Sequence, residues 1–383
     1  MIELFLKYAA NPTTGSELSV AIKNLMDSAG QGNADLVEMA ELAVHADPAK
    51  AFSFDADGFA TLRAGEHSWH AGRFETPSVA ELRQRARKAG ATGGRLRLWV
   101  LDGASPVTDV GGLQATAAPG SLFQAASQFN CLESPGPYVT PVVQYFRDRT
   151  QGPRSSISAF PGTLLRHYAA PRSDGTRFVQ TDADQLNLLA GVFGPDVARI
   201  QSGYLMAHNV RDPGALVAAL TARFESIRVG VHEGTQVILG YDFQGSVTDS
   251  ENRRIAQVFT STIAGGGYGG AGLEGEKFEG ACQQLLRAAY LGTLLAAATL
   301  GQRLAVLTLI GGGVFGNPIP LIWDAILWAA AETEQLLARD LDVIVNGRNL
   351  GDHVPRETIL AGVRKRGGAL LAFPRIGLPE VLQ

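Results

Sequence analysis

A glycine-rich segment between a buried strand and a helix constrains the fold more than any other feature of this chain. Residues 304–310 form an apolar run, Leu-Ala-Val-Leu-Thr-Leu-Ile, which is typical of a strand buried on both faces of a parallel sheet. The run enters Gly-Gly-Gly-Val-Phe-Gly-Asn at 311–317, and Asn317 followed by Pro318 predicts a helix cap with proline in the first turn. Glycines there leave room for a ligand against the backbone, and a helix start favours phosphate.

The same glycines allow two other interpretations. Gly311, Gly313 and Gly316 have the spacing G-x-G-x-x-G of dinucleotide-binding domains, which would indicate a nicotinamide-dinucleotide oxidoreductase. That fingerprint normally opens a domain with several strand-helix units after it, whereas only 67 residues follow Gly316 here, so the oxidoreductase is the weaker hypothesis. A tight turn that binds nothing is the other alternative, although such a turn needs fewer glycines.

Composition excludes several classes of function. The chain has 383 residues, of which 45% are hydrophobic and 18% charged, enough for a large buried core. A net charge of −4 without a basic cluster argues against nucleic acid as a main partner. Cys131 and Cys282 have no second cysteine or histidine at metal-ligand spacing, so we expect no metal site, and a reducing compartment is the natural setting. We also expect no bound cofactor.

Neither the start of the chain nor its most apolar window predicts a membrane partner. The first apolar stretch, at residues 2–6, is too short for a signal peptide. The window 288–300 is interrupted by Gly292 and Thr293 and is well short of a membrane span, so it is interpreted as a buried helix. We therefore expect a cytoplasmic protein.

From residue 95 onward the pattern alternates between strands and helices. Expected helices are 16–29, 78–89, 155–168, 182–193, 212–224, 276–300 and 320–339. Expected strands are 95–101, 121–129, 226–231, 235–239, 258–263, 304–310 and 341–345, with the third and fourth paired across a turn at Glu233-Gly234. A second glycine-rich loop at 265–270 contains Tyr268, which either closes over a ligand or forms a flexible tip. Right-handed crossovers would place the last three strands in one parallel sheet with helices on both sides.

Several segments together resemble a macrodomain-like family, the MavL-type ADP-ribosyl-ubiquitin hydrolases. They are 121–133, Thr140-Pro141, 148–153, 166–168, 257–259, 288–294 and 307–317, and the last also resembles the closing glycine loop of ordinary macrodomains. The resemblance covers roughly residues 96 to 346 and implies a three-layer α/β/α fold with a mixed sheet. It divides the chain into an N-terminal helical extension (1–94), an ADP-ribose-binding core (95–346) with an insertion at about 167–255, and a C-terminal tail (347–383).

The resemblance also implies an ADP-ribose site at the carboxyl ends of the strands, for either a hydrolase acting on an ADP-ribosylated protein or a non-catalytic ADP-ribose reader. Asp109 matches the residue that recognises adenine, and Gln128 to Asn130 would line the distal ribose. The diphosphate would lie on Gly311, Gly312, Gly313, Val314, Phe315, Gly316 and Asn317, with Phe315 covering a ribose or base. Thr150, Gln151 and Gly152, within 148–153, stand where the family has its first triple-glycine loop.

Cleavage of an ADP-ribosyl bond has oxocarbenium character, so a carboxylate that stabilises charge or activates water is the expected protein contribution. Glu133 and Asp148 are the candidates, because each follows a segment expected to face the ligand. The tandem glutamates of poly(ADP-ribose) glycohydrolases are missing, so the family's catalytic residues do not transfer directly. Alternatively, Glu133 is an acid on the surface without a catalytic role, and Asp148 caps the helix that follows Pro153. Asp182 and Asp184 are expected to cap a helix, and Asp242 and Asp249 are the next candidate acids.

Overall fold

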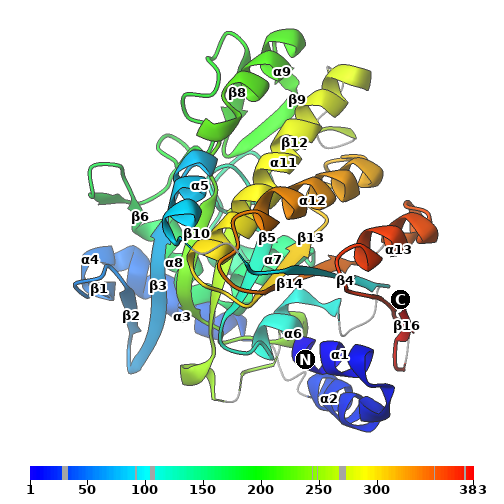
Figure 1. The fold of residues 1–383 in the computed structure, drawn as a ribbon. Helices are drawn as coiled ribbons and strands as arrows, with labels where there is room; N and C mark the ends of the chain where they lie inside the picture. The colour runs from blue at the N-terminus through cyan, green and yellow to red at the C-terminus, as the bar shows by residue number, and fades with distance from the viewer. Residues whose placement is uncertain are drawn as a thin grey trace.

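An 11-stranded mixed sheet organises the computed structural model of this chain, which describes residues 1–27, 33–90, 93–103, 108–243, 245–247, 249–266, 273–348, 350–374 and 377–383 (Figure 1). In spatial order its strands are β1 (Phe52–Phe54), β2 (Ala60–Ala64), β3 (His67–Glu75), β10 (Gly230–Gln236), β11 (Arg254–Thr260), β5 (Ser121–Ala126), β13 (Leu304–Thr308), β14 (Leu341–Gly347), β4 (Leu96–Asp102), β15 (Leu370–Ala372) and β16 (Glu380–Leu382). The central strands from β11 to β15 run parallel, and the outer pairs are antiparallel.

Helices cover both faces of the sheet (Figure 1). On one face lie α5 (Val79–Lys88), α11 (Gly275–Thr299), α12 (Ile319–Glu334) and α13 (Arg356–Arg364). On the other lie α1 (Ile2–Ala10), α2 (Gly15–Asp27), α3 (Ala34–Ala46), α4 (Pro48–Ala51), α6 (Val110–Ala115), α7 (Gln151–Ser158) and α8 (Phe160–Tyr168). The predicted three-layer α/β/α class with a mixed sheet is thereby confirmed.

Smaller elements complete the structure. A second sheet contains β12 (Ile263–Ala264), β9 (Tyr204–Val210) and β8 (Ala198–Gln201), next to α9 (Pro213–Ala222), and β6 (Ala170–Pro171) pairs with β7 (Arg177–Phe178). Short 3-10 helices are η1 (Pro12–Thr14), η3 (Val142–Arg147), η4 (Phe224–Ser226), η5 (Tyr241–Phe243), η6 (Ser250–Asn252) and η7 (Leu350–Asp352). No helix within the described ranges has the length and apolar character needed to cross a bilayer.

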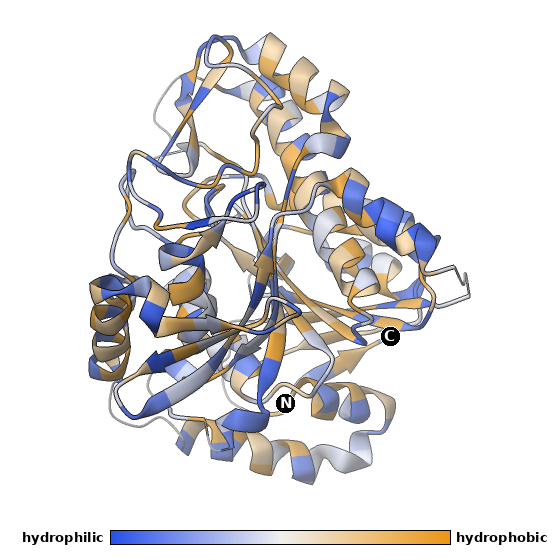
Figure 2. Cartoon of the chain, turned by 90° about the vertical axis from the view of Figure 1, so that its left-hand side faces the viewer, coloured by the Kyte–Doolittle hydropathy of each residue, from blue (hydrophilic) through white to orange (hydrophobic). Residues whose placement is uncertain are grey.

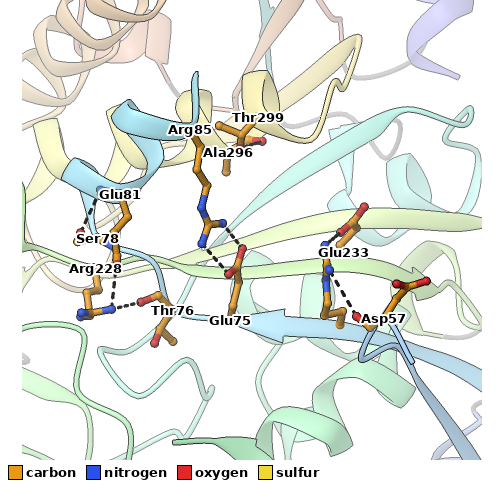
Figure 3. A network of polar contacts seen from close by, with 11 residues as sticks. Asp57, Glu75, Thr76, Ser78, Glu81, Arg85, Arg228, Glu233, Ala296 and Thr299 are labelled. Atoms are coloured by element: carbon orange, nitrogen blue, oxygen red, sulfur yellow. Dashed lines mark hydrogen bonds and ion pairs between the residues drawn. The ribbon is translucent and has the colours of Figure 1, made fainter. Parts of the chain in front are cut away.

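The central strands form because their residues are apolar on both faces. Every residue of β13 is buried, and hydropathy colouring shows apolar stretches among the strands in the middle of the molecule (Figure 2). Helix α5 begins with a capping box in which Ser78 and Glu81 exchange side-chain and backbone hydrogen bonds. Arg85 on α5 then pairs with Glu75 of β3, which fastens this helix to the antiparallel edge of the sheet (Figure 3).

Two predicted elements are wrong. Residues 182–193 are not helical, because their backbone bonds elsewhere: the N–H of Leu188 donates to the carbonyl of Phe129 at 2.9 Å, and that of Leu186 to Oε1 of Gln180 at 2.9 Å. The predicted hairpin at 226–239 is instead one strand, β10, with a bulge between His232 and Thr235. Gly234, with φ of +73°, supplies the left-handed residue of a bulge where a turn was expected.

Other boundaries also differ from the prediction. The helix expected at 155–168 is divided into α7 and α8, because Pro161 lacks the N–H that a continuous helix would require. Residues 52–75, predicted within a helical extension, form strands of the main sheet, as does β10 from the predicted insertion and β15 from the predicted tail. The division of the chain into domains stays a prediction.

Candidate functional site

A cavity of about 640 Å³ opens at the carboxyl ends of three neighbouring parallel strands, β5, β13 and β14. Its wall contains residues that follow these strands, the start of α7, and Tyr204 from β9. Ligands of open α/β sheets bind at this edge, because loops and helix N-termini converge there. The volume falls within the range of about 300–1,000 Å³ that is usual for small-molecule sites.

The glycine loop forms one side of the cavity, as its sequence predicted, but its cap differs. Gly311 and Gly316 both have positive φ, at +73° and +66°, which only glycine adopts without strain. Asn317 does not cap α12: its Oδ1 accepts from Thr262 Oγ1 at 2.8 Å and its Nδ2 donates to the Ile263 carbonyl at 2.9 Å, while Pro318 occupies the cap position. Asn317 therefore fastens the glycine loop to the start of β12.

The glycine loop and the first turn of α7 both contain backbone donors in residues that line the cavity. Within the described residues, the N–H groups of Gly313 and Val314 have no protein acceptor, nor do those of Gln151 and Gly152 at the start of α7. All four residues line the cavity. Two sets of unpaired N–H groups, one at the positive end of a helix dipole, suit an anionic ligand such as a diphosphate.

Glu133 places a buried carboxyl in the wall. The side chain is 7% exposed, and its Oε1 has no hydrogen-bond partner among the residues that the structure describes. Burial raises the pKa of the Glu133 carboxyl well above its usual range, although the Arg166 guanidinium and a hydrogen bond involving Ser127 act in the opposite direction. A Cβ on Gly152 would clash with the backbone carbonyl oxygen of Ala126 and lie 2.7 Å from Glu133 Oε2, so glycine lets α7 approach the end of β5 and Glu133.

Asp148, the second predicted acid, lies in the same wall and is less buried. Its Oδ1 accepts from the N–H of Thr150 at 2.9 Å, which shapes the turn leading into α7, whose cap residue is Thr150. Asp148 also acts electrostatically on Glu133, since its charge contributes to the raised pKa of that carboxyl. The two predicted acids therefore line the same cavity and interact electrostatically.

The other candidate acids lie outside the cavity wall. Asp242 pairs with Arg154 at 2.7 Å and with Arg149 at 3.0 Å. Asp249 accepts from Asn252 at 2.7 Å. Asp182 Oδ1 accepts from the N–H of Val139 at 2.6 Å, and Asp184 pairs with Arg172; neither is a helix cap, because residues 182–193 form no helix.

Ten of the predicted site residues line the cavity together: Gln128, Glu133, Asp148, Thr150, Gln151, Gly152, Gly311, Gly313, Val314 and Phe315. Five others do not line it: Asp109, Asn130, Gly312, Gly316 and Asn317. Tyr268 lies outside the described residues.

Two of the residues outside the wall have clear structural tasks. The Asp109 carboxylate accepts from the N–H of Gly112 at 3.0 Å, which caps α6, and it pairs with Arg154. Asn130 Oδ1 accepts from the N–H of Leu132 at 3.0 Å and shapes the turn before Glu133. The role of Asp109 in adenine recognition remains a prediction, and both carboxylate oxygens already have partners.

The sequence interpretation missed several residues of the wall, above all Thr308, Asn346 and Arg348. Thr308 and Asn346 are partners in the register of β13 and β14. Each carries a buried polar atom without a partner among the described residues, Thr308 Oγ1 and Asn346 Oδ1, as does Gln128 at its Oε1. The rule that ligands lie beyond the carboxyl ends of parallel strands, applied to the strand predicted at 341–345, would have found Asn346.

No known family model matches this chain, and no curated protein does. Among solved structures, poly(ADP-ribose) glycohydrolase from Thermomonospora curvata is similar at 14% identity and a TM-score of 0.38, covering 86% of this chain and 98% of that one. The glycohydrolase from Deinococcus radiodurans in complex with ADP-ribose is similar at 10% identity and a TM-score of 0.39, covering 76% and 93%. At such scores these likenesses carry no argument about the site.

Proposed function

We propose that this protein binds ADP-ribose in the cavity and hydrolyses the bond between ADP-ribose and a modified protein. The observation that carries the proposal is the buried Glu133 carboxyl in a wall that also presents unpaired backbone N–H groups from the glycine loop and α7. A buried carboxyl whose pKa is raised by burial, beside an anion-binding backbone, suits general-acid cleavage of the glycosidic bond of a diphosphate ligand. The sequence resemblance to macrodomain-like hydrolases agrees with this arrangement.

The order of the strands suggests the direction of the ligand. Glu133 follows β5, the glycine loop follows β13, and Asn346 is in the last part of β14. Neighbouring strands are about 4.8 Å apart, so β5 and β14 are separated by about 10 Å. An extended ADP-ribose would span them with its distal ribose beside Glu133, its diphosphate over the glycine loop, and its adenosine toward β14.

In the proposed reaction the bond from the anomeric carbon of the distal ribose to the modified side chain breaks. Glu133, whose pKa is raised by burial, donates its proton to the departing atom, and a water oxygen forms the new bond to the same carbon. Asp148, which is more exposed, accepts the proton of that water. The products are free ADP-ribose and the unmodified side chain. One water is consumed, and the proton gained by Asp148 is lost to solvent while Glu133 regains one from solvent.

A non-catalytic ADP-ribose reader is the second candidate function. It would use the same backbone donors, but it would gain nothing from a buried acid beside the distal ribose. The unpaired Oε1 of Glu133 therefore favours the hydrolase. Turnover of a modified substrate separates the two functions.

Calorimetric titration with ADP-ribose, NAD and ATP tests the binding half of the proposal. We expect ADP-ribose to bind in the micromolar range, about −8 kcal/mol, with ATP weaker. Tight binding of NAD alone would favour the dinucleotide oxidoreductase, and absence of binding by all three would contradict the proposal.

A further inference from the structure

Asn346 presents a hydrogen-bond acceptor whose orientation is fixed by the backbone. Its Nδ2 donates to the carbonyl of Thr108 at 2.9 Å, and a carbonyl only accepts, so the amide oxygen must be on the opposite side. The residue is 4% exposed, and its Oδ1 has no partner among the described residues. A buried acceptor without a donor costs free energy, which a bound ligand with an N–H or O–H group would recover.

A donor lies two residues further along the chain. Arg348 also lines the cavity, and its Nη1 donates to Thr108 Oγ1 at 3.2 Å. Within the described part of the chain, no carboxylate lies within salt-bridge distance of this guanidinium; burial lowers its pKa, although the charge of Asp109 acts to raise it. Both side chains thus contact Thr108, so an acceptor with no charge and a donor with a full positive charge stand in the same part of the wall.

We propose that Asn346 and Arg348 select a 6-aminopurine at the nucleoside end of the ligand, with Asn346 Oδ1 accepting from the exocyclic amine. Adenine presents that amine beside ring-nitrogen acceptors, which suit the Arg348 guanidinium. Hypoxanthine has a carbonyl oxygen at position 6, which would oppose Oδ1 and leave both acceptors unpaired. The inference rests on the proposed function, and it assigns adenine to an amide where the resemblance implies an acid, Asp109.

Position within the sheet supports this assignment. Asn346 is in β14, whereas Glu133 follows β5, with β13 between the two strands. The nucleoside end and the scissile bond of ADP-ribose are on opposite sides of its diphosphate, as β14 and β5 are on opposite sides of β13, which the glycine loop follows. Asp109, by contrast, caps α6 and pairs with Arg154 outside the wall.

The test compares ADP-ribose with its inosine analogue by titration calorimetry, for the wild type, Asn346→Ala and Thr308→Val. Thr308 is the matched control, since it also carries a buried unpaired oxygen in the wall and is the partner of Asn346 in register. We expect the wild type to prefer ADP-ribose at least about tenfold, which corresponds to about 1.4 kcal/mol. Asn346→Ala should reduce that preference to within about twofold, while Thr308→Val should change the two affinities by equal factors.

The outcomes separate the inference from the function on which it rests. If the wild type binds both nucleotides equally, or if Asn346→Ala weakens both by the same factor, ADP-ribose is bound but Asn346 does not read the base. If the wild type binds neither nucleotide, the proposed function fails together with the inference. Should Asn346→Ala fail to fold, Asn346→Ser replaces it. The inference then requires the wild type to prefer ADP-ribose at least about tenfold and Asn346→Ser to lose most of that preference.

Discussion

The phenol oxygen of Tyr145 accepts a hydrogen bond from the backbone N–H of Glu133 at 3.0 Å. Tyr145 belongs to η3, the short helix that ends immediately before Asp148. The first N–H groups of η3 donate in turn to Glu41 of α3, from Val142 at 2.6 Å and from Val143 at 2.8 Å. Glu41 therefore holds η3 in place. Tyr145 of η3 in turn positions Glu133, and Asp148 directly follows η3.

Replacing Glu41 by glutamine should therefore destabilise the protein. Its Oε1 accepts from Val142 and from the Tyr168 hydroxyl at 2.7 Å, so the new amide nitrogen would face the N–H of Val143. We expect a loss of about 1–3 kcal/mol in the free energy of unfolding, measured with urea. Tyr168→Phe, which removes one of the three bonds, should cost about 1 kcal/mol. An unchanged unfolding midpoint in Glu41→Gln would contradict this role.

Gly313→Glu should abolish ADP-ribose binding in a folded protein. A Cβ at Gly313 would have no atom within 4 Å, so the longer side chain has room to enter the cavity without disturbing the core. There it would put a negative charge where the diphosphate is proposed to lie. Gly313→Ala is the control and should bind almost normally. Equal ADP-ribose affinity of Gly313→Glu and the wild type would contradict the proposal that the glycine loop binds the diphosphate.

The raised pKa of Glu133 predicts a pH dependence of stability. Above the ordinary pKa of a glutamate the unfolded chain loses this proton, while the folded protein keeps it until the raised pKa is reached. The free energy of unfolding should therefore fall as pH rises across that interval, and Glu133→Gln should remove this contribution. Urea unfolding of both proteins between about pH 4 and 8 measures the difference. Parallel curves would show that Glu133 does not titrate abnormally.

Asp109→Asn separates a structural from a recognition role for this residue. Because Asp109 caps α6 and its buried carboxylate pairs with the half-buried Arg154, its amide variant should lose about 1–3 kcal/mol of stability. The preference for ADP-ribose over its inosine analogue should persist. A loss of that preference in Asp109→Asn, with Asn346→Ala unaffected, would restore the assignment of adenine to Asp109.

Local patterns in the sequence predict the centre of the fold well. The apolar run of β13 predicts a strand that is buried on both faces, as the structure shows. The long apolar and helix-favouring segment of α11 also predicts a helix. Glycine density likewise predicted the loop at 311–316. These features depend on residues close together in the chain.

Features that depend on distant partners were not predictable in this way. Gly234 forms a bulge only because β3 and β11 flank β10 on both sides, and the segment 182–193 avoids a helix because Phe129 and Gln180 capture its backbone donors. The unpaired Oδ1 of Asn346 exists only because Thr108 occupies the other side of the amide. Long-range hydrogen bonds of this kind leave no periodic signal in a single sequence.

Release of ADP-ribose from an ADP-ribosylated protein tests the central claim most directly, with ADP-ribose affinity measured in parallel. The wild type should release ADP-ribose from at least one of the serine-, arginine- or carboxylate-linked substrates. Glu133→Gln and Asp148→Asn should each slow release at least about tenfold while binding ADP-ribose almost normally, since an acid acting in the transition state contributes little to ground-state affinity. Binding without release from any substrate by the wild type would contradict the hydrolase and leave the reader in its place.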